Sequence, residues 1–381
     1  MARLAGCLCV IAWPLALFGA AGAATGTNPA AFVGVSVAPV TLPDPSVVIT
    51  PGGNTSDPFV IEVGGIYYMF SAQAAPLGPS VPLMVSTSLT SWDLTPVEAM
   101  PILPSWSAPG FTWSPDVRAL DGHYVMWFSA AVAGGEYKCI GVATSSSVTG
   151  PYVSSSQHPL VCQFGDLGSI DPRTFVDPEG RLWLLWKSDD NADLAASTHT
   201  TIYVQQLSSD GTRLLGSPRA LMTADLPWEG RIVESPDMVY AAGRYWLFFS
   251  GNWYNQPAYA IGVAACLGPT GPCEPTSSGP WLGSNAQGSG PGEESLFFDG
   301  SRWWMLYAPN SAGYDSLTRR PVALARLTFG PNGPAVVAPG TAAWDQGDPH
   351  PVIVGATGPA KKPRAGPICT STQLQTSCGV R

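Results

Sequence analysis

The chain has 381 residues, of which 45% are hydrophobic, 10% aromatic and 12% charged, so it has ample material for a large packed core and is not a disordered tail. It carries 27 acidic and 18 basic residues, a formal net charge of −9, and has no long run of lysine and arginine. Nucleic acids and anionic membrane surfaces are therefore poor candidate partners.

Residues 1–23 have the pattern of a secretory signal peptide. Met1-Ala2-Arg3 precedes an apolar stretch from Leu4 to Phe18, and small residues follow as far as Ala23. The apolar run is shorter than the ~20 residues that span a bilayer, which disfavours a membrane anchor. We expect a secreted, extracellular protein that is cleaved near Ala23.

Removal of the signal leaves an even number of cysteines, which favours disulfides over free thiols in an oxidising compartment. Zinc is disfavoured because no Cys-x-x-Cys occurs and the four histidines are scattered. We expect neighbours in sequence to pair, as Cys139–Cys162, Cys266–Cys273 and Cys369–Cys378.

Five segments repeat one pattern, in which an acidic or proline-containing start leads through a short strand and a glycine turn to an aromatic-rich strand. A third strand candidate follows in each. The turn glycines are Gly65, Gly122, Gly180, Gly243 and Gly300, spaced 57, 58, 63 and 57 residues apart. This period fits a four-stranded blade and predicts an all-β, five-bladed β-propeller over residues 24–330, with residues 331–381 as a C-terminal tail on or beyond it. A β-sandwich does not need a repeating hairpin, and the coils of a β-helix are shorter.

Acidic residues recur at the start of all five expected inner strands. Because these strands line the central channel of a propeller, we expect the acids at one mouth of a common funnel, and they are Asp57, Asp116, Asp171, Glu234 with Asp237, and Glu293 with Glu294. Crowded carboxylates can supply the general acid and general base that glycoside hydrolysis needs. Aromatic residues near the same ends could stack on sugar rings, and they are Trp113, Trp186, Trp253 and Phe59.

In order and at blade spacing, these segments resemble the glycoside hydrolases of family 43. The carriers are Ser56-Asp57-Pro58, Trp113-Ser114-Pro115-Asp116, Ile170-Asp171-Pro172 and Val233-Glu234-Ser235-Pro236. The resemblance implies a secreted enzyme acting on arabinose- or xylose-containing polysaccharides, foremost at α-L-arabinofuranosidic linkages. It implies inversion, with Asp57 as general base, Asp171 as the residue that tunes the acid and orients substrate, and Glu234 as general acid.

Substrate contacts are expected from Trp113, Asp116, Trp253 and Glu294, in a monomer that requires no cofactor. Many relatives hold a central ion with a fifth-blade Gly-His, where this chain has Gly292-Glu293, so a central Ca²⁺ stays open as an alternative. Two other functions also stay open. One is a carbohydrate-binding propeller without catalysis, and the other is a β-xylosidase or fructan-acting enzyme.

Overall fold

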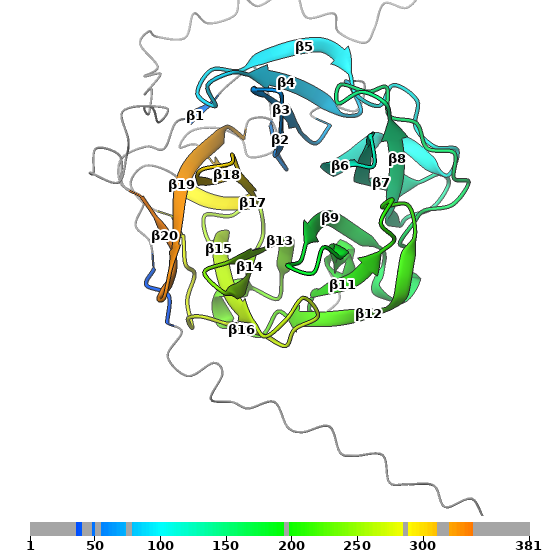
Figure 1. Ribbon diagram of the computed structural model, residues 1–381. Coiled ribbons are helices and arrows are strands. Elements are labelled where there is room, and N and C mark those ends of the chain that lie inside the picture. The colour runs from blue at the N-terminus through cyan, green and yellow to red at the C-terminus, as the bar shows by residue number, and fades with distance from the viewer. Residues whose placement is uncertain are drawn as a thin grey trace, which may run out of the picture.

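The computed structural model describes residues 36–39, 48–49, 55–73, 78–193, 198–284, 289–310 and 320–337. These residues form five β-sheets around a central axis (Figure 1), which confirms the predicted all-β, five-bladed propeller. Within them, the helices are single 3-10 turns at Phe164–Asp166, Asp190–Ala192 and Pro227–Glu229. None of the described helices is long and apolar enough to cross a membrane. Residues 1–23 and most of the expected C-terminal tail lie outside the described residues.

Each sheet is an antiparallel blade whose strands follow chain order outward from the axis. Blade I contains β2 (Phe59–Val63), β3 (Ile66–Phe70), β4 (Pro82–Ser86) and β5 (Asp93–Glu98), and blade II contains β6 (Ser107–Leu120), β7 (His123–Val132) and β8 (Lys138–Ser145). Blade III contains β9 (Ser169–Val176), β10 (Leu182–Ser188), β11 (Thr201–Leu207) and β12 (Leu214–Thr223). Blade IV contains β13 (Val233–Ala241), β14 (Arg244–Gly251), β15 (Ala260–Cys266) and β16 (Cys273–Pro275). Blade V contains β17 (Ser289–Phe298), β18 (Trp303–Asn310) and β19 (Val322–Gly330).

The innermost strands form a closed ring. β2, β6, β9, β13 and β17 each pack against the innermost strands of the two neighbouring blades, and β17 returns to β2 (Figure 1). Two short strands complete blade V by pairing with β19, namely β1 (Val48–Ile49) and β20 (Gly333–Val336). Residues that precede blade I therefore join the last blade, which holds the ring shut. β20 lies just beyond residue 330, where the sequence pattern ends.

The five turn glycines connect the first and second strands of their blades as predicted. All five have φ between +77° and +93°, and an added Cβ at any of them would meet nothing within 4 Å. Their conformation, rather than lack of space, therefore requires glycine.

The core consists of five apolar clusters, each between two adjacent blades. Successive residues of one strand enter different clusters, so that Leu184 packs with Trp127 of blade II whereas Leu185 packs with Leu247 of blade IV. Both faces of a blade are thus buried, which explains why the second strands are apolar without alternation.

Two of the three predicted disulfides are confirmed. Cys139–Cys162 ties the second blade to the loop that precedes β9, and Cys266–Cys273 joins β15 to β16. Cys369 and Cys378 lie outside the described residues.

Candidate active site

One residue within or just before each innermost strand has a left-handed backbone. The five residues are Asp57, Ser114, Asp171, Ser235 and Glu293, with φ between +49° and +58°. Non-glycine residues adopt this conformation only where the surrounding structure holds them in it, often at functional sites. All five line one pocket with Pro172, Arg173 and Pro236, and its empty volume is about 210 Å³ including its opening to solvent. We call these five residues the left-handed ring.

Asp57 lies beside a carboxylate from blade V. Its backbone N–H donates to Glu293 Oε2 at 3.0 Å, and the other oxygen of Glu293 forms a buried ion pair with Arg320. Burial raises the pKa of Asp57 well above its ordinary value, and the carboxylates of Glu293 and Asp171 raise it further, whereas Arg320 and Ser114 lower it. Once ionised, Asp57 is therefore a stronger proton acceptor than an exposed aspartate.

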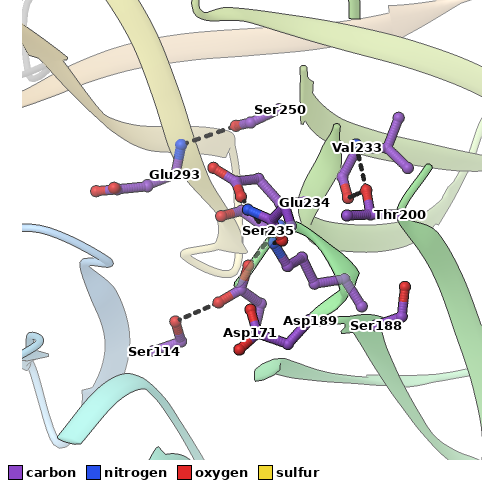
Figure 2. A network of polar contacts seen from close by, with 12 residues as sticks. Ser114, Asp171, Ser188, Asp189, Thr200, Val233, Glu234, Ser235, Ser250 and Glu293 are labelled. Carbon is purple, nitrogen blue, oxygen red and sulfur yellow. Dashed lines mark hydrogen bonds and ion pairs between the residues drawn. The ribbon is translucent and has the colours of Figure 1, made fainter. Parts of the chain in front are cut away.

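Asp171 links three blades at the floor of the site. Its Oδ1 accepts from Ser114 Oγ at 2.9 Å, and its Oδ2 accepts from the N–H of Ser235 at 3.1 Å (Figure 2). Burial raises the pKa of Asp171 to about 6, with Lys187 lowering it and Glu234 raising it. Asp171 is thus a fixed group whose charge changes slightly below neutral pH.

Glu234 immediately precedes the ring residue of blade IV, and its side chain lies near Asp171 (Figure 2). Its Oε2 is 3.1 Å from Lys187 Nζ, and its Oε1 accepts from the hydroxyl of Tyr259 at 2.7 Å. Lys187 is 1% exposed and Tyr259 is fully buried. Glu234 is therefore held by a buried cation and a neutral hydroxyl donor, with Asp171 nearby.

The structure brings the three predicted catalytic acids together but separates two of the predicted substrate contacts from them. Asp116 is fully buried and accepts from the N–H and hydroxyl of Thr174 at 2.7 and 2.9 Å. Glu294 is also fully buried and accepts from Ser250 Oγ at 2.7 Å. Neither residue is among those that line the pocket. Both contribute to the packing beneath the site.

The two predicted tryptophans lie at its periphery. Trp113, half-buried, has Lys138 Nζ 5.5 Å from the centre of its ring. Trp253, also half-buried, lines a second pocket with Asn191 and Arg231. This second pocket adjoins the acids through Asn191, whose side chain accepts from Lys187 Nζ at 2.7 Å. Trp253 therefore lines a pocket that adjoins the acids.

Sequence reasoning missed Lys187, Tyr259 and Arg320, which touch the acids, and left Glu293 at the mouth without a role. Lys187 directly follows the apolar run Leu182-Trp183-Leu184-Leu185-Trp186, and a charge at the end of a buried strand is the one signal that could have marked it. Glu293 could have been found by its match in the repeat to Asp57 and Asp171.

A central Ca²⁺ ion, which the resemblance left open, would need oxygen ligands at the axis. Ca²⁺ takes six to eight oxygen ligands. Within the described residues, no group of three or more Asp, Glu, His or Cys is arranged to hold a metal ion. Glu293 is already occupied by Arg320 and by the N–H of Asp57.

The sequence model of the glycosyl hydrolases family 43 matches residues 47–334, which cover all five blades. The chain belongs to this family.

Two curated proteins and one solved structure are similar to this chain. An extracellular endo-α-(1→5)-L-arabinanase of Thermotoga petrophila is 28% identical over 261 residues, covering 57% of this chain and 50% of the relative. The extracellular endo-α-(1→5)-L-arabinanase 2 of Bacillus subtilis is 24% identical over 279 residues, covering 64% and 53%. The chain thus spans about half the length of these curated relatives. The crystal structure of a thermostable family-43 glycoside hydrolase superposes with a TM-score of 0.68 at 26% identity, over 78% of this chain and 96% of that one.

Proposed function

We propose that this protein is an inverting glycoside hydrolase that cleaves α-L-arabinofuranosidic bonds of arabinan. The observation that carries the proposal is the placement of Asp57 and Glu234 on blades I and IV with the carboxylate of Asp171 between them. Inversion needs an acid and a base ~6.5–9.5 Å apart, so that water fits between the base and the sugar. The names of the two arabinanase relatives support arabinan as the substrate.

In the proposed reaction, Glu234 donates a proton to the leaving oxygen while Asp57 takes a proton from the attacking water. Burial raises the pKa of Asp57 most, and the carboxylates of Glu293 and Asp171 raise it further. Asp57 therefore keeps its proton to a higher pH than an exposed aspartate does, and while it is protonated it cannot accept a proton from water. The acidic limb of the pH profile then reports Asp57. Asp171 holds the N–H of Ser235, the residue that follows Glu234, and so positions the acid.

Activity on linear arabinan, an aryl α-L-arabinofuranoside and an aryl β-D-xyloside tests the proposal. We expect cleavage of arabinan and of the arabinofuranoside, and a loss of at least about 10³-fold in Glu234→Ala on arabinan. Glu274→Ala is the matched control because Glu274 is exposed on outer strand β16 of the same blade. Cleavage of the xyloside alone would favour a β-xylosidase, and binding to arabinan without cleavage would favour a carbohydrate-binding propeller.

Secretion is part of the proposal. It is supported by the signal-like residues 1–23, by the two disulfides and by the extracellular relatives. N-terminal sequencing of protein recovered from culture medium should begin near residue 24, and retention of the protein in the cell would contradict it.

A further inference from the structure

A second set of equivalent positions lies one layer beneath the left-handed ring. These residues stand two positions after the ring residue in each innermost strand, are all at most 8% exposed, and are Phe59, Asp116, Arg173, Asp237 and Ser295. One side chain from every blade is therefore buried at this level. Arg173 is the only cation among the five.

Arg173 is held by contacts from other blades. Its Nε is 3.8 Å from Asp237 Oδ2 on blade IV, and its guanidinium lies 5.1 Å over the ring of Phe59 on blade I. Burial raises the pKa of Asp237 to about 7 and that of Glu294 to about 8, and the charge of Arg173 lowers both. Burial also raises the pKa of Asp116, which Arg173 again lowers. The guanidinium of Arg173 thus favours the ionised form of three buried acids and opposes the effect of burial on their pKa values.

The same side chain forms part of the floor of the pocket. Arg173 is among the pocket's lining residues beside Asp57, Asp171 and Glu293, and its Nη1 is buried without a hydrogen-bond partner in the described part of the chain. A buried N–H without a partner points to an acceptor that the protein does not supply, and a water oxygen is the simplest. It does not suit a metal ion, because a guanidinium repels cations and has no lone pair to offer.

We propose that the guanidinium of Arg173 is the permanent axial cation of this propeller, so that the buried acids Asp116, Asp237 and Glu294 are neutralised, and the acids of the pocket above them positioned, without a metal ion. Arg173 is a positioning residue in this proposal, since it acts through the inner strands and the carboxylates. Arg173 on β9 carries the positive charge that a bound cation would bring, and it would repel a second cation at the axis. The inference rests on the proposed hydrolase activity only for its activity readout.

Chemical rescue of Arg173→Ala tests this role. We expect the variant to lose about 100-fold in kcat/KM on arabinan, because small displacements of catalytic groups cost about this much. Guanidinium chloride below its denaturing range should restore at least a tenth of the lost activity, while urea, which is neutral and of similar shape, should not. Arg173→Lys should retain more activity than Arg173→Ala. Arg244→Ala is the matched control, because that arginine also lies over an aromatic ring, Trp246 at 5.7 Å, but at the start of β14.

Metal analysis of the wild type gives a readout that does not depend on activity. We expect no stoichiometric metal in protein purified without chelator, and the same melting temperature in EDTA and in CaCl₂. One bound Ca²⁺ per chain, or activity lost in EDTA and restored by Ca²⁺, would overturn the proposal. A folded Arg173→Ala variant that is fully active, or that urea restores as well as guanidinium does, would overturn it too. If Arg173→Ala does not fold, Arg173→Lys and the metal analysis still decide the matter.

Discussion

Lys187 and Asp171 act on Glu234 with opposite charges, so removing each should move the pH profile in opposite directions. Lys187 Nζ is 3.1 Å from Glu234 Oε2, and Asp171 is a second acid near the same carboxyl group. If Glu234 is the general acid, the alkaline limb of kcat/KM reports the loss of its proton. Lys187→Met should move that limb to higher pH, and Asp171→Asn should move it to lower pH.

The size of the shift follows from the geometry. Two unit charges 3.1 Å apart attract by about 5 kcal/mol at an effective dielectric constant of about 20. The desolvation of both groups offsets much of this attraction, and opposite charges at such distances shift titrations by about 1–3 pH units. Burial lowers the pKa of Lys187, but the carboxylates of Glu234, Asp189 and Asp171 outweigh it and raise the pKa overall, so the lysine stays charged throughout the profile. We expect about 1–2 units upward for Lys187→Met and about one unit downward for Asp171→Asn.

Linear arabinan is the substrate for this assay, because its leaving sugar needs a proton. Lys138→Met is the control, since Lys138 pairs with Asp189 at 3.1 Å in the same part of the molecule and, within the described residues, forms no hydrogen bond or ion pair with Glu234. Circular dichroism at each pH separates loss of activity from loss of fold. Alkaline limbs that move in the same direction in both variants, or a shift in Lys138→Met as large as that in Lys187→Met, would refute the reasoning.

Three further outcomes are expected. Glu234→Ala should lose far more activity on arabinan than on an aryl arabinofuranoside whose good leaving group needs little protonation, and equal losses on both would be evidence against its role as the acid. Asp57→Ala should lower the activity on both substrates by the same factor, because water must still be activated. Asp93→Ala, at an exposed position on β5, should keep wild-type activity on both substrates. Burial raises the pKa of Glu294 from its ordinary 4.5 to about 8, so the folded state holds a proton that the unfolded chain releases, and stability falls as pH rises across that window. The melting temperature of Glu294→Gln should therefore be a few degrees above that of the wild type at pH 9, whereas at pH 4 the two proteins should melt at the same temperature. The same difference in melting temperature at both pH values would contradict this.

The blade count could be predicted because it depends on local chemistry. Each first hairpin needs a residue with positive φ, glycine supplies it, and the spacing of those glycines reports the length of a blade. The closure of the ring could not be predicted in this way. Val48 and Ile49 form only a two-residue strand, and their partners in β19 lie more than 270 residues later in the chain.

The acids were predicted to lie together at one mouth of the funnel, whereas in the structure some line the pocket and others are buried beneath it. The left-handed residue and the bulges of the innermost strands change the direction of successive side chains, so a shift of one or two residues moves a carboxylate from the pocket to the buried axis. Asp57 and Asp171 occupy the ring position itself, Glu234 precedes it, and Asp116 and Asp237 follow it by two. Sequence spacing marks the start of each strand but does not reveal where its bulge lies.

Inversion at the anomeric carbon tests the central claim most directly. Proton NMR of linear arabinan at early times after enzyme addition follows the configuration of the first-formed reducing end, before mutarotation mixes the anomers. With Asp57 activating water and Glu234 protonating the leaving oxygen, the α-linked substrate should first release the β-anomer. An α-anomer formed first would mean that a carboxylate attacks the sugar itself, and it would contradict these assignments even within the same fold.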